Sequence, residues 1–180
     1  MHRISAYVTL ALIFIMAISI LYLPILFFLK KRGVAIIRQL SCLALFCSSF
    51  LIVFATILFT PITFTPEIYI LNITPFDWLN NANMFVAEVI PNIMMFIPLG
   101  IFVPIVFAKT RKFYKTAVIA LLVTFSVEAF QYFIGRSSDI DDIIANLAGG
   151  IIGYGIFKFL NILLKNKIWW SKLLGNNLTA

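Results

Sequence analysis

Residues 116–164 read TAVIALLVTFSVEAFQYFIGRSSDIDDIIANLAGGIIGYGIFKFLNILL, two apolar stretches joined by one short polar turn. Each stretch is close to the roughly 20 helical residues that cross a hydrocarbon core. The turn, from Gly135 to Asp142, carries one cation and three acids, and Lys115 and Lys165 flank the whole segment. This pattern predicts two consecutive membrane-spanning helices.

The composition of the 180-residue chain agrees with this prediction. Hydrophobic residues make up 62% of the chain and charged residues only 12%, and the mean hydropathy is +1.05. So few polar side chains cannot cover a water-facing globule of this size, which excludes a soluble domain. We therefore predict that residues 1–180 form a single membrane domain, an all-α polytopic bundle.

Five stretches are long and apolar enough to span a bilayer, since a helix rises about 1.5 Å per residue. A cleaved signal peptide does not fit the first stretch, because its apolar part is too long and a basic run, residues 30–32, follows it directly. The five predicted spans are Ile4 to Leu29, Leu40 to Phe59, Pro91 to Ala108, Thr116 to Ile134 and Ile143 to Leu164.

The basic residues predict the orientation of these spans. Twelve of the 14 lie in segments 30–38, 109–115 and 158–172, which five spans place on one side of the membrane. Lys and Arg in short loops are retained in the cytoplasm. We therefore predict an external N-terminus and a cytoplasmic C-terminus, with four spans and an interfacial first stretch as the alternative. The net charge of +7 then reflects topology, with the lipid bilayer rather than nucleic acid as partner.

Several chemistries lack their central residues. The only histidine is His2, so zinc-protease, catalytic-triad and papain-type sites are excluded. Cys42 and Cys47 lie five apart in an apolar run, where a helix places them on different faces and prevents a disulfide. We expect neither a cofactor nor a metal, because acids at a helix start, such as those in the turn, favour capping and the helix dipole.

Polar residues in and next to the last three predicted spans indicate a site on the external side. Glu128 lies about 9 Å beneath the outer end of its span, and an ionisable residue at such a depth is a functional candidate. We expect Arg136 to pair with a neighbouring acid, Glu128, Asp139 or Asp142, because an unpaired buried carboxylate is costly. Nothing comparable is expected on the cytoplasmic side. The expected cluster comprises Asn92, Glu128, Gln131, Arg136, Asp139, Asp142 and Asn146.

Two interpretations of this cluster remain open, an outward-facing ligand pocket and a structural network that joins three helices. Small residues at steps of three or four on the last span favour close helix contact, and prolines in the third span favour a kink. We expect helix-packing roles for Pro98, Gly100, Gly149 and Gly153.

The connection from Thr60 to Glu88 is unusually long and apolar and contains no Lys or Arg. Such a segment is poorly suited to dangling in solvent, so we expect it to dock as a pocket wall or lid, with a short interfacial helix near Leu79 to Val89. An aromatic anchor at the membrane interface without a ligand role is the alternative.

Three spaced patterns lie between residues 70 and 155: Asn72-x2-Pro75-Phe76, then Asn92-x3-Phe96-x-Pro98-x-Gly100, then Glu128-x2-Gln131-x4-Arg136-x2-Asp139-x2-Asp142-x3-Asn146-x2-Gly149-x3-Gly153. In these patterns the chain resembles the VanZ-like membrane proteins, a family named for a teicoplanin-resistance protein of Gram-positive bacteria. The resemblance implies a multi-pass bacterial membrane protein connected with glycopeptide antibiotics or the cell envelope. It also directs attention to Asn72, Pro75 and Phe76 as the loop wall over the polar cluster.

Two functional hypotheses follow. The preferred one is a non-catalytic envelope protein whose outward-facing pocket binds an amphiphile, either a lipoglycopeptide antibiotic or a lipid-linked wall precursor. The alternative is an intramembrane hydrolase or transferase acting on a lipid-linked substrate, with Glu128 as general acid or base. The absence of an evident nucleophile, histidine or metal set counts against the alternative.

Overall fold

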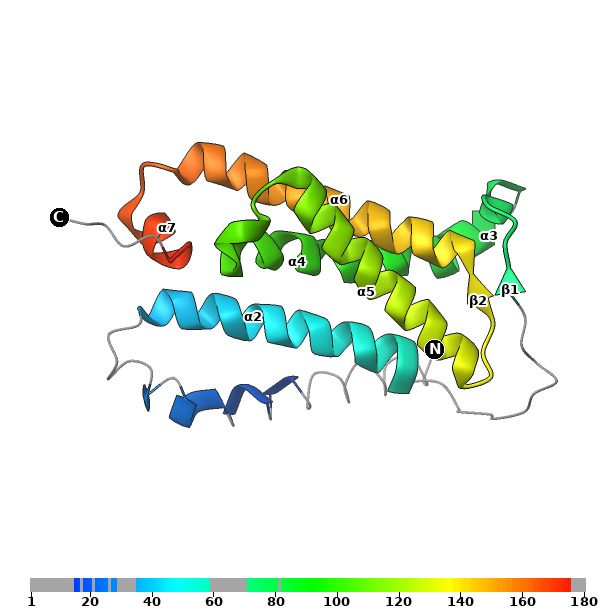
Figure 1. Ribbon diagram of the computed structural model, residues 1–180, viewed down its shortest axis with the longest axis horizontal. Helices are drawn as coiled ribbons and strands as arrows, with labels where there is room; N and C mark the ends of the chain where they lie inside the picture. Colours follow the sequence, from blue (N-terminus) through cyan, green and yellow to red (C-terminus); the bar gives the residue numbers. More distant parts are fainter. Residues whose placement is uncertain are drawn as a thin grey trace.

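The computed structural model describes residues 15–16, 18–20, 22–25, 27–28, 35–58, 71–80 and 82–175. They form a bundle of long helices, which confirms the all-α membrane fold (Figure 1). Four helices are long and apolar enough to cross a membrane: Ile36–Thr56, Ala82–Val106, Phe113–Phe133 and Ile140–Leu164. The predicted first span, Ile4 to Leu29, lies largely outside the described residues, so a fifth span rests on the sequence alone.

The first of these four helices consists of α2 (Ile36–Val53) and the π-helical turn η1 (Phe54–Leu58). It begins four residues before the predicted start at Leu40. The reason is Arg38, whose side chain does not face lipid. Its guanidinium folds onto backbone carbonyls at the end of another helix, so the charge is accommodated within the helical segment.

The second helix corrects the prediction of a separate interfacial helix before Pro91. After the parallel strand β1 (Leu71–Asn72) and the 3-10 turn η3 (Asp77–Asn80), α3 (Ala82–Met84), the π-helical turn η4 (Phe85–Val89) and α4 (Ile90–Val106) follow without interruption. Pro91 has no N–H for the helical hydrogen-bond pattern. The π-helical turn directly before it accommodates this defect, so the helix continues.

The last two membrane-spanning helices form the predicted hairpin. The 3-10 turn η5 (Ala108–Thr110) leads into α5 (Phe113–Phe133), and strand β2 (Ser138–Asp139) leads into α6 (Ile140–Leu164). The Asp139 side chain caps α6 by accepting a 2.9 Å hydrogen bond from the N–H of Asp141, as expected for a helix start.

The short helix α7 (Ile168–Leu173) folds back at the far end of α6 (Figure 1). Trp170 anchors it, because this side chain is only 3% exposed and packs against Phe157 with ring centroids 6.5 Å apart. Its indole N–H donates a 2.9 Å hydrogen bond to the Asn161 side chain.

Helices α4 and α6 form the centre of the bundle and lie at backbone contact. A Cβ atom on Gly100 would lie 2.2 Å from the Gly150 carbonyl oxygen, and one on Gly149 would lie 2.2 Å from that of Ile93. Gly153 faces the Ile97 carbonyl at the same distance. These three glycines form a glycine seam in which a larger residue would collide with the facing backbone. Small residues at such positions allow two helices in a membrane to approach closely.

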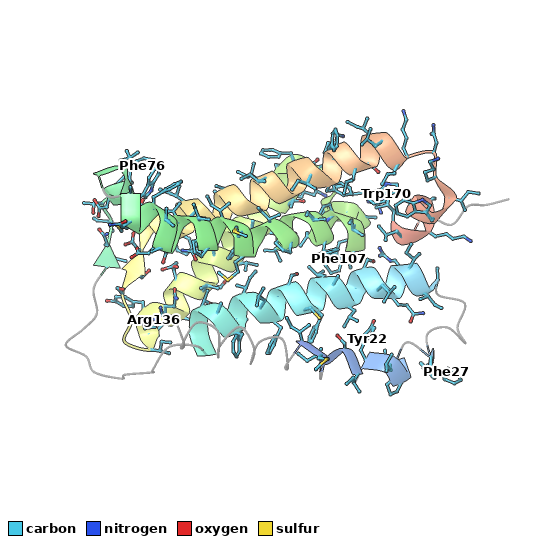
Figure 2. The ribbon with its side chains drawn as sticks, turned by 180° about the vertical axis from the view of Figure 1, so that it is seen from behind. Tyr22, Phe27, Phe76, Phe107, Arg136 and Trp170 are labelled. Carbon is cyan, nitrogen blue, oxygen red and sulfur yellow. The ribbon has the colours of Figure 1, made fainter. Side chains whose placement is uncertain are left out.

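The bundle has two chemically different ends. The acidic end contains the start of α4, the end of α5 and the start of α6, where β1 and β2 pair (Figure 1). The basic end contains the start of α2, the end of α4, the start of α5 and α7. Figure 2 shows Phe76 and Arg136 at the acidic end and Phe107 and Trp170 toward the basic end.

Candidate functional site

The predicted polar residues lie at the acidic end, on four elements. Asn92 is on the first turn of α4 and donates a 2.5 Å hydrogen bond from its amide to the Asp142 carboxylate on α6. This contact joins residues 50 positions apart and holds the starts of the two central helices together. Both residues belong to the predicted cluster, but the sequence did not predict this pairing.

Glu128 is buried near the end of α5, with 3% of its side chain exposed. One carboxylate oxygen accepts a 3.1 Å hydrogen bond from the Ser138 hydroxyl and another of 3.1 Å from the backbone N–H of Asp139. Glu128 therefore holds the turn between α5 and α6. Ser138 is itself buried, and its role was not evident from the sequence because serines in turns are common.

Gln131 and Arg136 bind a single backbone oxygen, the carbonyl of Thr56 in η1. The Gln131 amide donates at 3.0 Å, and the Arg136 guanidinium donates a second hydrogen bond. The Thr56 hydroxyl donates to the Ile52 carbonyl at 2.7 Å. These contacts attach the end of the α2–η1 helix to the α5–α6 hairpin. No sequence signal identified Thr56, because the contact uses its backbone rather than its side chain.

The predicted ion pair of Arg136 with a neighbouring acid is not present as a direct contact in the part of the chain that the structure describes. The hydrogen bond made by its guanidinium goes to the Thr56 carbonyl, and among the described residues the structure contains no direct pair with Glu128, Asp139 or Asp142. Burial lowers the pKa of Arg136, while the nearby charges of Glu128 and Asp142 raise it. The cation is therefore held on a helix end and interacts with these two acids at longer range.

Asn146 completes the predicted set deeper in the bundle. It is 1% exposed and donates a 2.9 Å hydrogen bond to the Thr124 hydroxyl on α5. The Asn146 and Gln131 side-chain oxygens are both buried and without a donor among the described residues. Acceptors left in this state normally bind water or a ligand, since an unsatisfied buried polar group costs about 1–3 kcal/mol.

The described part of the long loop docks on the turn between α5 and α6. Leu71 and Asn72 pair with Ser138 and Asp139 as parallel strands. The Asn72 amide also donates to Asp139 at 3.0 Å and to Asp77 at 3.1 Å. Residues 71–80 are therefore docked, whereas their role as a pocket wall or lid stays a prediction, and residues 59–70 and 81 are not among the described residues.

Pro75 and Phe76 form the tip of this docked segment, and both are exposed. Phe76 adopts φ 68°, which is uncommon for an aromatic residue. Its ring contacts Trp78 edge-on, with centroids 6.0 Å apart. The segment thus presents aromatic side chains beside the polar cluster, the composition expected of either a ligand wall or an interfacial anchor.

Asp141 fixes this tip, although sequence reasoning assigned it only to helix capping. Its buried carboxylate accepts hydrogen bonds from the backbone N–H groups of Phe76 at 2.6 Å and Asp77 at 3.0 Å. Asp77 in turn accepts from Asn72 and Thr74, and these bonds lower the pKa of Asp77. In the sequence, the clustering of three acids in one turn was the one feature that pointed to this role of Asp141.

The basic end, which the charge rule predicts to be cytoplasmic, also contains an ordered polar network, so the expectation that nothing comparable exists at that end is wrong. Arg38 donates to the carbonyls of Ile105 at 2.7 Å and Leu173 at 3.2 Å, and also to that of Val106. Arg111 donates to the Pro104 carbonyl at 3.2 Å and to that of Leu174 at 2.5 Å. Two arginines thus bind the negative ends of α4 and α7, where helix carbonyls lack partners.

Comparison with known proteins supports a family assignment. A family model described as VanZ/LLP1 matches residues 14–161. Protein VanZ of Enterococcus faecium is 35% identical over 92 residues, which cover 51% of this chain and 54% of that protein. The match therefore spans about half the length of this relative. No solved structure matches the chain.

Together with the four membrane-spanning helices, these similarities make the chain a multi-pass bacterial membrane protein. The family match includes α2, α4, α5 and nearly all of α6, and therefore every element that builds the acidic end. Because the match extends over far more than half of the sequence, the chain belongs to the VanZ/LLP1 family.

Proposed function

We propose that this protein lowers the susceptibility of a bacterial cell to teicoplanin-type lipoglycopeptides by binding an amphiphile at the acidic end of the bundle. Membership of the VanZ/LLP1 family supports a link to teicoplanin resistance. The bound amphiphile is either the antibiotic or a lipid-linked wall precursor. Both carry hydroxyl, amide or charged groups on an apolar body, which suits a polar site at the membrane surface.

One observation carries the proposal, the excess of buried acceptors at this end. The Gln131 side-chain oxygen is buried without a donor among the described residues, and reversing the amide would place that oxygen about 3.0 Å from the Thr56 carbonyl oxygen, an acceptor against an acceptor. The carboxylates of Glu128 and Asp142 influence each other, and Arg136 is the one cation among the described residues whose charge acts on both. Such a site favours a ligand group that donates hydrogen bonds.

The acidic end faces the outside in this proposal, because the basic end carries the Lys and Arg residues that cytoplasmic loops retain. A ligand from the outer leaflet or from the medium then meets the docked segment 71–80 first. Phe76, at 46% exposed, offers an aromatic wall beside the charged cluster. We do not adopt the catalytic alternative, because the contacts of Glu128 hold the Ser138–Asp139 turn and leave its proposed chemistry without a partner group.

Expression in a susceptible Gram-positive host tests the proposal. The wild-type protein should raise the inhibitory concentration of teicoplanin severalfold and leave that of vancomycin, which lacks the acyl chain, nearly unchanged. Gln131→Leu removes the unpartnered acceptor and should abolish the effect at equal membrane abundance. Glu88→Gln, an exposed acid at the same end, is the matched control and should retain it.

Two results would overturn the proposal. One is an unchanged teicoplanin susceptibility despite verified expression of the wild-type protein. The other is full protection by the Gln131→Leu variant. Glu128→Gln separates the two hypotheses, because it preserves shape and removes ionisation: full protection by this variant eliminates the general acid or base.

A further inference from the structure

A long apolar crevice lies between α2 and α5, and residues of α4 also line it. Helix α5 packs against η1 at the acidic end but diverges from α2 toward the basic end (Figure 1). Two cavities of about 490 Å³ and 590 Å³ fill the space between them. The residues that line both cavities, and so make them continuous, are Ser49, Leu99, Ile119 and Val123.

The lining offers an occupant no free hydroxyl donor. Its hydroxyls belong to Ser49 and Ser126, which donate to the carbonyls of Leu45 at 3.0 Å and Leu122 at 2.7 Å within their own helices. The remaining lining residues are hydrophobic side chains and Cys42. The crevice is therefore suited to a hydrocarbon chain.

The crevice is long enough to hold most of a lipid acyl chain. From Ile119 to Phe130, the two ends of the lining on α5, a helix rises about 16 Å. Half of a hydrocarbon core of roughly 30 Å is about 15 Å, the depth that the acyl chains of one leaflet fill. The crevice can therefore hold a lipid chain along most of its length.

The basic end of the crevice is bordered by cations. Cys42 and Val106 line it there; Arg38 is one helical turn from Cys42, and its guanidinium binds the Val106 carbonyl. Phe107, another lining residue, directly precedes the segment that carries Lys109, Arg111 and Lys112. Arg38 and Arg111 donate to the carbonyls of the adjacent residues Leu173 and Leu174, so the two guanidiniums lie close together.

No side-chain carboxylate among the described residues balances these charges. The described acids all belong to the acidic end, at residues 77, 88, 128, 139, 141 and 142. Two neighbouring arginines with exposed lysines beside them therefore form a positive region at the mouth of an apolar crevice. Basic sites between helices at the membrane surface are typical binding sites for anionic lipid head groups.

We propose that an anionic phospholipid occupies this crevice, with an acyl chain between α2 and α5 and its phosphate beside Arg38, Lys109 and Lys112. The site is separate from the acidic end and does not depend on the function proposed for it. The head group lies at the basic end of the bundle, and its phosphate supplies a negative charge that no side chain among the described residues provides there.

Other occupants are less suited to the crevice. A separate cavity of about 470 Å³, lined by Ile18, Tyr22 and Ile25 together with Cys42 and Phe46, places the described early residues beside α2. They border the crevice at its basic half rather than fill it. A second copy of the chain would bring further cations to an already positive mouth, which disfavours it at this position.

Thermal unfolding of the purified full chain in a neutral detergent tests the proposal. Phosphatidylglycerol at a hundredfold excess over its dissociation constant should raise the unfolding midpoint by about 5–10 °C. Phosphatidylcholine with the same acyl chains should have a much smaller effect, and inorganic phosphate alone should have none. Equal effects of the two phospholipids, or a full effect of phosphate, would overturn the proposal.

Matched variants test the two parts of the site. Val123→Trp fills the crevice and should abolish the effect of phosphatidylglycerol, whereas Val118→Trp, on an exposed position of α5 outside the lining, should retain it. Ser126→Phe, at an exposed lining position, serves as a second filling variant if Val123→Trp does not fold. A full lipid effect in a folded filling variant would show that this crevice is not the binding site, and would point to the early segment or a second copy as its cover.

The head-group part is tested by charge removal. The double variant Lys109→Gln/Lys112→Gln should lose most of the difference between the two phospholipids. Lys165→Gln/Lys167→Gln removes the same charge from exposed positions between α6 and α7 and should preserve that difference. If both double variants behave alike, the phosphate is not bound at the mouth of the crevice and the proposal fails.

Discussion

The carboxylate of Asp141 accepts a 2.6 Å hydrogen bond from the backbone N–H of Phe76, 65 residues earlier in the chain. Phe76 has φ 68°, and an unusual backbone conformation of this kind costs about 1–3 kcal/mol unless its surroundings hold it. The second hydrogen bond of Asp141, from the N–H of Asp77, completes the restraint. The tip of the docked segment is therefore fixed by one buried acid on α6.

Removing this acid should release the segment. Asp141→Ala leaves two backbone N–H groups without their acceptor, and we expect a loss of roughly 1–3 kcal/mol in the free energy of docking. Limited proteolysis in detergent should then cleave within residues 71–80 much faster than in the wild type. Glu88→Ala, which removes an exposed acid nearby, is the control and should leave the rate unchanged. Equal protection of Asp141→Ala and wild type would contradict the restraint.

The glycine seam predicts opposite effects of one substitution at two positions of α6. Gly153→Ala places a Cβ 2.2 Å from the Ile97 carbonyl and must separate α4 from α6, with an expected destabilisation of about 1–3 kcal/mol or more. Gly155→Ala has no atom within 4 Å and should stabilise the helix by roughly 0.5–1 kcal/mol. Thermal unfolding followed by circular dichroism compares them. A neutral Gly153→Ala would show that the helices are farther apart.

Asp77 predicts how docking depends on pH. Hydrogen bonds from Asn72 and Thr74 lower the pKa of Asp77 below its unfolded value. The stabilisation is therefore complete above the ordinary carboxyl range and is lost as the pH falls through the lowered pKa. Carbon-13 NMR of the Asp77 carboxyl should show the low pKa, and Asn72→Ala should move it upward. An ordinary pKa for Asp77 in the wild type would refute the arrangement.

Arg38 should control the attachment of α7. Arg38→Met removes the hydrogen bonds to the carbonyls of Ile105, Val106 and Leu173, and bonds from charged donors contribute about 1.5–3 kcal/mol each. We expect Trp170 to become accessible to acrylamide quenching in a Trp78→Phe/Trp169→Phe background. Lys158→Met, an exposed cation on α6, should leave quenching unchanged. A shielded Trp170 in Arg38→Met would show that packing against Phe157 is sufficient.

Orientation is tested with single cysteines in a Cys42→Ser/Cys47→Ser background. Ser137→Cys is exposed at the acidic end, and Lys109→Cys is exposed at the basic end. An external acidic end predicts that an impermeant maleimide labels Ser137→Cys in intact cells and Lys109→Cys only after lysis. The reverse pattern would place the basic end outside and would require a different positioning of the ligand.

Apolar length and small-residue spacing were sufficient to predict the central helices. The α5–α6 hairpin, the close contact at Gly149 and Gly153, and the capping by Asp139 all follow from local patterns. The helices begin before their predicted starts because a charged or polar residue near a helix start, such as Arg38, has the composition of a loop. Local composition does not reveal that such a side chain turns back onto protein.

The contacts that the sequence did not predict join a polar side chain to a backbone atom far away in the sequence. Arg38 binds carbonyls of α4 and α7, Arg136 binds the Thr56 carbonyl, and Asp141 binds the N–H of Phe76. Every residue carries the same backbone groups, so residue type gives no signal for their partners. The sequence therefore indicates which polar side chains are costly to bury. It does not indicate which backbone groups form hydrogen bonds with them.

The bridge between β1 and β2 has a consequence for biosynthesis. Asn72 and its partner Asp139 are 67 residues apart, so the loop leaves the ribosome before its partner exists. At about 5–20 residues per second, roughly 3–13 s pass before Asp139 is synthesised. During this interval the exposed aromatic segment has no native surface to cover it. Completion of the α5–α6 hairpin is thus the step after which segment 71–80 is protected from membrane proteases and no longer available to chaperones.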